Sequence, residues 1–427
     1  MLSDEAIDKL IQPIIQRQIN INNYVIGIIA ERIKEIGEVK PSDLHKLHRL
    51  EALMCSGSDV QKINKRLAEL TKLQVADIQR IIKDVAVDSY LDMKRFYDYR
   101  ELPFIPYKEN TQLQKVVNSI AKQTSNTYKN LSKSQAFMIR DLKNPKVLKP
   151  TSISDTYKTI IDEAVQASQT ASIDYNTAMR RSMKQLIDSG IRNVSYNTES
   201  GRVYTQRLDT AVRRNILDGI RAINQGVQNE TGKQFGADGV EITVHEYPAP
   251  DHAPVQGHQF TLEEYSKISP TPSILPDNSI DTSNYEKTDS VLYDVDGREY
   301  ELFERKIGTL NCRHFTFSII IGVFPPNYTD KQLQQVLDRN EKGYTMSNGK
   351  HLTMYQCTQK QREYETKVRW AKDGQIAARK AGDEDLAKEY QAKINKYIAE
   401  YKAFSNACGL TVKNRNMQVS GYRKLYI

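Results

Sequence analysis

Side chains that could do acid–base, nucleophilic or metal chemistry gather in two short segments, residues 245–257 and 308–314. The reactive residues of these segments are His245, Asp251, His252, Cys312, Arg313 and His314. Both segments flank runs that are typical of strands, so we expect them in loops at strand ends. This combination fits a metal centre, a reaction centre, or a polar cluster that holds a small domain together.

A metal centre would use thiolate and imidazole, which are the usual zinc ligands. The four candidate ligands are His245, His252, Cys312 and His314. Their spacing differs from that of a standard zinc finger, because the Cys-x-His pair places two ligands on one face of an extended strand. We therefore predict that the protein has no cofactor, and the alternative is a structural zinc ion.

A reaction centre could use Asp251 to orient His252 or His245 as a general base, or Cys312 as a nucleophile beside His314. No Gly-rich phosphate loop, nucleophile elbow or HExxH motif accompanies these residues. We therefore expect that the protein is not an enzyme, and we name no catalytic residue.

In a polar cluster the same groups would cross-link the loops by hydrogen bonds and ion pairs. Five neighbours would then have structural roles: Asp251, Gln256, Gly257, Asn311 and Arg313. The residue types alone leave the metal, the catalytic and the structural interpretations open.

The elements around the two segments follow from the spacing of apolar residues. Ile7, Leu10, Ile11 and Ile14 show the helical spacing that recurs over most of the first 240 residues. Val240–His245 alternates with a period of two, which predicts a strand ending at His245. We expect an α+β fold that is predominantly α-helical, with long helical arms flanking a small mixed α/β domain that has a short hairpin and central strands.

Shifts in composition divide the chain into five expected regions. They are a helical N-terminal region (1–130), a basic linker (131–153), long helices with the short hairpin (154–238), a small α+β domain carrying the His and Cys motifs (239–328), and a charged C-terminal helical region (329–427). The segment 266–290, which is rich in Pro, Ser, Thr, Asn and Asp, is expected to be a loop.

The charge balance is modestly positive, with 61 Lys and Arg against 53 Asp and Glu in 427 residues. A net charge of +8 is a weak indication of an acidic partner such as nucleic acid. The expected phosphate contacts are Lys133, Arg140, Lys143, Lys146, Lys149, Lys413, Arg415, Arg423 and Lys424. Four scattered cysteines without a CxxC pair indicate a reducing compartment, and no apolar run is long enough to span a bilayer.

The two segments also carry a family resemblance. A strand that ends in a histidine, a Pro-containing loop with a second histidine, and a Gln-Gly pair are found here as His245, Pro250, His252, Gln256 and Gly257. The Asn-Cys-Arg-His run at 311–314 follows, and then Gly322-Val323. This pattern resembles the phage minor capsid protein 2 family, which is related to Mu-type head morphogenesis proteins, and the resemblance extends over roughly residues 150–427.

The chain also departs from the family pattern at two places. Ala249-Pro250 stands where the family usually has Arg-Pro, and Val255 stands where an aromatic residue often precedes Gln-Gly. These departures weaken a catalytic role for the loop more than a structural one.

The resemblance implies a structural minor capsid protein of a tailed bacteriophage. Such a protein would lie inside the head at the portal vertex, and in the host cytoplasm during assembly. Its partners would be the portal protein, the major capsid protein and packaged double-stranded DNA, which it would contact non-specifically. It could leave the head with the genome and touch a membrane only during ejection.

Two alternatives remain open at this point. One is a phage-encoded enzyme or injected effector, a metal-dependent or Cys/His hydrolase, centred on His245, His252, Cys312 and His314. The other is a host DNA-binding or scaffold protein. A portal gene beside the gene for this chain would speak against the host protein.

Overall fold

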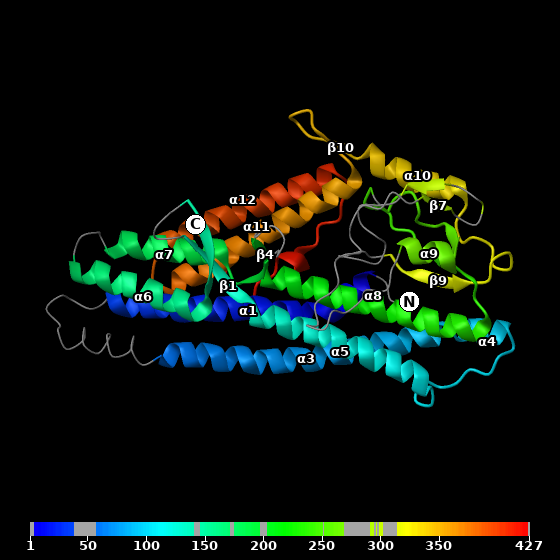
Figure 1. The fold of residues 1–427 in the computed structure, drawn as a ribbon. Coiled ribbons are helices and arrows are strands. Elements are labelled where there is room, and N and C mark those ends of the chain that lie inside the picture. The colour runs from blue at the N-terminus through cyan, green and yellow to red at the C-terminus, as the bar shows by residue number, and fades with distance from the viewer. Residues whose placement is uncertain are drawn as a thin grey trace. The chain divides into compact units, whose positions relative to one another are not determined.

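The fold was analysed in a computed structural model of the full chain (Figure 1). It describes residues 4–37, 57–140, 146–170, 175–196, 203–250, 252–268, 291–293, 296, 299–301 and 314–425. Long helices and a few short antiparallel strands make up these ranges, which confirms the predicted α+β, predominantly helical class. Within these ranges no helix is long and apolar enough to cross a membrane.

The helices include several of more than twenty residues. They are α1 (Asp4–Gly37), α3 (Ser58–Asp92), α4 (Lys94–Tyr99), α5 (Thr111–Lys133), α6 (Ile153–Thr170), α7 (Tyr175–Ser189), α8 (Leu208–Phe235), α9 (Leu262–Ile268), α10 (Asp330–Lys342), α11 (Met354–Lys380), α12 (Glu384–Ala407) and the short 3-10 helix η2 (Asn414–Met417).

Within the described ranges the strands form four small antiparallel sheets. The strands are β1 (Gln135–Arg140), β2 (Leu148–Ser152), β3 (Arg192–Tyr196), β4 (Val203–Arg207), β5 (Gly239–Ile242), β6 (Gln259–Thr261), β7 (Val291–Tyr293), β8 (Glu299–Glu301), β9 (Thr316–Ile319), β10 (Tyr344–Thr345) and β11 (His351–Leu352). Their orders are β2-β1-β3-β4, β6-β5-β9, β7-β8 and β10-β11.

The chain forms two compact units, each assembled from three separate stretches. Unit 1 contains residues 1–12, 75–129 and 213–358, and unit 2 contains residues 13–74, 130–212 and 359–427. Several long helices, α3 and α8 among them, run from one unit into the other. The units are therefore not consecutive domains, and each is described separately below.

Unit 1 is built from helices and the three-stranded sheet β6-β5-β9. Helix α5 begins where Asn110 Oδ1 accepts a hydrogen bond from Leu113 N at 3.0 Å, which caps its first turn. Its apolar positions Leu113, Val117 and Ala121 follow at intervals of four residues and are buried. Helix α8 approaches α5 closely because Gly219 faces Thr124 without a side chain of its own.

Unit 2 combines helices with the four-stranded sheet β2-β1-β3-β4. Helices α11 and α12 are joined by a turn at Gly382, whose φ of 74° is in the left-handed region. Asp383 caps α12 by accepting a hydrogen bond from Leu386 N at 2.9 Å. Gly374 on α11 lies against the ring of Tyr390 on α12, so these two helices also pack closely.

The structure corrects two expectations about individual elements. The stretch 131–153, expected as a basic linker, contains the antiparallel pair β1–β2, in which Phe137 is fully buried. Strand β5 ends at Ile242, three residues before His245. The expected short hairpin is confirmed as β3–β4, with Arg192 opposite Arg207. The expected loop at 266–290 lies mostly outside the described residues.

Candidate functional site

The sheet of unit 1 brings both histidine segments to the same end of two paired strands. Strands β5 and β9 are antiparallel, with Ile242 opposite Thr316. The pairing continues past β5, because Thr243 N donates to Phe315 O at 2.8 Å. His245, which follows β5, and His314, which precedes β9, therefore lie at the same end of the two paired strands.

The loop between β5 and β6 folds back, and its second histidine, His252, contacts His314. His252 N donates to Ala249 O at 2.9 Å, and Gly257 N donates to Ile242 O at 2.8 Å. Gly257 has a φ of 77°, and a Cβ at this position would overlap the side chain of Leu333. Only glycine fits such a position without strain, which accounts for the Gln-Gly pair.

Three histidine rings are in contact at this strand end. The ring centroids of His245 and His314 are 4.5 Å apart, and those of His252 and His314 are 5.1 Å apart, both in edge-to-face arrangements. His252 and His314 are only 2% and 4% exposed. Aromatic rings packed in this way stabilise a core beyond the area that they bury.

Gln256 connects the cluster to the backbone. Its Oε1 accepts a hydrogen bond from His245 N at 2.9 Å and lies 3.3 Å from His314 Nε2. Gln256 is itself 2% exposed. One buried amide oxygen thus holds both the end of the β5 segment and the histidine that precedes β9.

The other predicted members of the site are Asp251, Asn311, Cys312 and Arg313, and they lie outside the described residues. Across the described ranges, no group of three His, Cys, Asp or Glu side chains is placed to hold a metal ion. The described residues therefore do not by themselves form the alternative zinc site. The structure brings His245, His252, His314, Gln256 and Gly257 together as a packed polar cluster.

A family model described as phage minor capsid protein 2 matches residues 2–406. The chain belongs to this family. No match is found among the curated proteins or among the solved structures.

Membership of the phage minor capsid protein 2 family confirms the suspected resemblance and extends it into the N-terminal third of the chain. A structural role in a phage capsid follows from the family, and so does a place in the virion.

The residues expected to contact DNA all belong to unit 2 in this member of the family. Lys133 ends α5, Arg140 ends β1, Lys149 lies in β2 and Lys146 lies shortly before it, and all four are exposed. The C-terminal set of Lys413, Arg423 and Lys424 is also exposed, and Arg415 is half-buried. Lys143 lies outside the described residues.

One polar residue of the same sheet was not predicted. Glu241 on β5 is 1% exposed, and its carboxylate accepts hydrogen bonds from Gln259 Nε2 at 3.0 Å and from Asn327 Nδ2 at 2.8 Å. In an alternating strand, a glutamate between Val240 and Ile242 indicates a solvent-facing position. Here the residues after β9 cover that face, and no local sequence pattern predicts that Glu241 is buried.

Proposed function

We propose that this minor capsid protein lies inside the phage head near the portal and contacts packaged DNA through unit 2. The main support is the distribution of charge along the chain. Residues 354–427 hold fifteen Lys and Arg against eight Asp and Glu, so this C-terminal part accounts for +7 of the net +8. Concentrated positive charge is what non-specific contact with phosphates requires.

The basic C-terminal segment is held against α11 by hydrogen bonds to its backbone. Arg369 Nη1 donates to Asn416 O at 2.6 Å, Lys372 Nζ donates to Met417 O at 2.7 Å, and Gln375 Nε2 donates to Arg423 O at 2.8 Å. These bonds fix the path of the segment while Lys413, Arg423 and Lys424 stay exposed. A fixed row of cations loses less conformational entropy on binding than a free tail does.

Titration of random duplex DNA at several salt concentrations tests the DNA contact. The triple variant Lys413→Gln, Arg423→Gln, Lys424→Gln should bind more weakly, and its salt slope should be smaller by roughly one for each phosphate that the variant no longer neutralises. The matched control replaces three exposed lysines of unit 1 by glutamine, Lys331, Lys342 and Lys350. If both triple variants changed the slope equally, or if binding did not depend on salt, the assignment of DNA contact to unit 2 would be wrong.

The position near the portal is supported by the family alone, as are the portal and major capsid partners and ejection with the genome. Localisation of the chain by cryo-EM of virions before and after genome release tests all of these together. Density at the portal vertex that disappears on release would support them, and density on the outer capsid surface would contradict them.

Within this role we propose that the histidine cluster is structural and has neither a metal nor a catalytic function. The contact of three rings around the Gln256 amide supports this, because it connects the two strands of the sheet. Elemental analysis of the purified protein and its melting temperature with a chelator test the proposal. One equivalent of zinc, together with a lower melting temperature after chelation, would identify a zinc site instead.

A further inference from the structure

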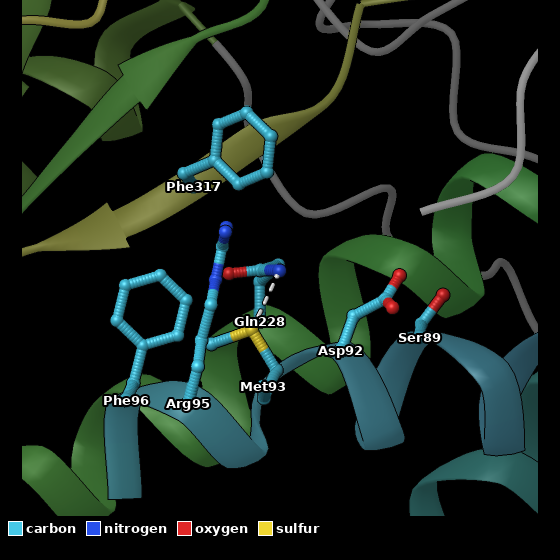
Figure 2. A pocket seen from close by; sticks show the side chains of 7 residues that line it. All are labelled: Ser89, Asp92, Met93, Arg95, Phe96, Gln228 and Phe317. Atoms are coloured by element: carbon cyan, nitrogen blue, oxygen red, sulfur yellow. Dashed lines mark hydrogen bonds between the residues drawn. The ribbon is translucent and has the colours of Figure 1, made fainter. Parts of the chain in front are cut away.

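Unit 1 contains a small cavity that is separate from the histidine cluster. It has a volume of about 190 Å³ and is lined by Ser89, Asp92, Met93, Arg95, Phe96, Gln228 and Phe317 (Figure 2). These residues come from the end of α3, the start of α4, helix α8 and strand β9. The cavity therefore lies where three helical segments meet the edge of the sheet.

The apolar side of the cavity belongs to a cluster of aromatic rings. The ring of Phe96 stacks on Phe235 with centroids 5.8 Å apart, and it also contacts Phe324 at 5.8 Å. Met93 is 2% exposed, whereas Phe317 is half-buried. An apolar cavity of roughly 150 Å³ is known to accept benzene, so a cavity of this size accommodates one six-membered ring.

Most polar groups of the cavity already have partners within unit 1. Gln228 Nε2 donates to Met93 Sδ at 3.1 Å, and Gln228 Oε1 accepts from Ser318 N at 3.2 Å. Ser89 Oγ donates to Asn224 Oδ1, and Asp92 has contacts of its own. These groups are therefore poorly placed to recognise the hydrogen-bonding edge of a ligand.

Arg95 differs from them. Its guanidinium carbon lies 4.8 Å from the centroid of the Phe96 ring, and in Figure 2 it stands beside Phe96 on the side of Met93 away from Asp92. Among the described residues it forms no ion pair. A guanidinium above a ring, without a carboxylate of its own, suits a planar anion such as a carboxylate.

Exposed apolar residues flank the lining in the sequence. Leu91 precedes Arg95 by four residues and is 54% exposed, and Val323 adjoins Phe324 and is 48% exposed. The lining itself contains two aromatic residues, a methionine and an arginine, which are the residue types enriched at the centres of protein–protein interfaces.

From these observations we propose that the cavity binds an aromatic side chain of a partner protein, and that the partner presents a carboxylate close to this aromatic ring. The ring would pack against Phe96 and Phe317, and the carboxylate would accept hydrogen bonds from Arg95. A nucleobase suits the site less well, because Gln228 and Ser89, which could read its edge, already have partners. The proposal concerns unit 1 and is independent of DNA contact by unit 2.

The smallest probe with this chemistry is N-acetyl-L-phenylalanine, and its neutral counterpart is N-acetyl-L-phenylalaninamide. Titration of the full-length chain, followed by NMR of the probe, should give saturable binding of the acid with a dissociation constant on the order of millimolar. The amide should bind about tenfold more weakly, because it lacks the charge that Arg95 recognises.

Substitutions test whether the two probes bind in this cavity. Arg95→Gln should weaken the acid about tenfold and leave the amide unchanged, whereas Arg100→Gln, an exposed control near the end of α4, should change neither. Phe317→Trp should block both probes by filling the cavity, and circular dichroism shows whether this variant is folded.

Three results would overturn the proposal. They are the absence of saturable binding, equal binding of acid and amide, and an unchanged affinity for the acid in a folded Arg95→Gln protein. Tighter binding of thymidine monophosphate at the same residues would assign the cavity to a nucleotide and would likewise refute a protein partner.

Discussion

The two units bury polar groups in different ways. In unit 1 the buried polar centres pair side chains with amide groups, as in the His245, His252 and His314 cluster around Gln256, and the hydrogen-bond donors that the described residues offer the Glu241 carboxylate are amides. In unit 2 the buried polar centres include pairs of opposite charges, as in the pairs that Arg32 forms with Asp59 and that Arg207 forms with Asp373.

Asp59 illustrates the second arrangement. Its Oδ2 accepts hydrogen bonds from Arg32 Nη2 at 2.7 Å and from the Tyr157 hydroxyl at 2.7 Å. Burial raises the pKa of this carboxyl, but the hydrogen bonds from Tyr157 and Arg32 outweigh it, so the pKa is below its usual value. Because this buried carboxylate is stabilised by the charge of Arg32, loss of Arg32 would leave it with weaker compensation. Unit 2 should therefore depend more on charge balance than unit 1 does.

A larger network in unit 2 allows the strongest test of this difference. Arg207 forms ion pairs with Asp209 at 3.2 Å and with Asp373 at 3.1 Å, and both carboxylates are almost fully buried. Burial disfavours the charge on Arg207, yet the two aspartates raise its pKa overall. Arg207→Met should lower the free energy of unfolding by about 3–5 kcal/mol, because two buried carboxylates lose their shared partner. Urea denaturation measures this change.

The matched control for Arg207→Met is Lys396→Met. Lys396 is 70% exposed and is 3.8 Å from Glu400, so its loss should cost less than about 1 kcal/mol. Hydrogen exchange should show the effect of Arg207→Met first in β3 and β4. If both variants were equally stable, the buried ion pairs of unit 2 would contribute no more to its stability than an exposed pair does.

The same network should make the stability of unit 2 depend on pH. Burial and the negative charge of Asp209 raise the pKa of Asp373 from 3.8 to about 6, although Arg207 opposes this shift. Between these pH values the folded chain keeps a proton that the unfolded chain has lost. The contribution of Asp373 is therefore fully present below pH 3.8 and is lost as the pH rises through 6, and it amounts to at most about 3 kcal/mol.

Asp373→Asn removes this titration and keeps the shape of the side chain. The other carboxyl groups titrate in both proteins, so the difference in unfolding free energy between variant and wild type isolates Asp373. This difference should shift in favour of the variant as the pH rises from about 4 to about 7. A difference that is constant across this range would show that Asp373 does not titrate there.

In unit 1 the corresponding change should cost less. Glu241→Gln would place an amide NH₂ among the donors of Gln259 and Asn327, which now share a carboxylate. One or two buried hydrogen bonds would be broken, for about 1–3 kcal/mol. Glu263→Gln on the exposed face of α9 is the control and should be near neutral. A loss equal to that of Arg207→Met would remove the distinction between the units.

The local features of this architecture could be predicted from the sequence. The histidine cluster could be expected because His245 and His314 adjoin runs that alternate like paired strands. The helices could be predicted from the spacing of apolar residues such as Leu113 and Val117. The many basic residues of 131–153 predict an exposed linker, whereas the segment forms a strand pair in which Phe137 is buried.

The charged centres of unit 2 could not be predicted in the same way. Tyr157 and Asp59 are 98 residues apart, and Arg207 and Asp373 are 166 residues apart. A buried aspartate and an exposed one have the same local sequence pattern, because only the fold decides which charges are removed from water. The discontinuous units have the same cause, since each is assembled from three distant stretches.

Substitutions at close helix crossings should destabilise the two units equally, and their effect on stability is the smallest that we predict. A Cβ at Gly219 would overlap Thr124 in unit 1, and a Cβ at Gly374 would overlap the Tyr390 ring in unit 2. Overpacking costs about 1–3 kcal/mol, and the better helix propensity of alanine returns about 1 kcal/mol. Gly219→Ala and Gly374→Ala should therefore each destabilise the chain by about 0–2 kcal/mol in thermal or urea unfolding.

The two glycine variants together show whether the difference between the units is one of charge or of packing. Gly27→Ala is the control, because a Cβ there meets only the flexible end of Lys380, which can move away. Equal losses for Gly219→Ala and Gly374→Ala would confine the difference to buried charge. A much larger loss in unit 2 would mean that tight packing, and not ion pairing, makes that unit sensitive to substitution.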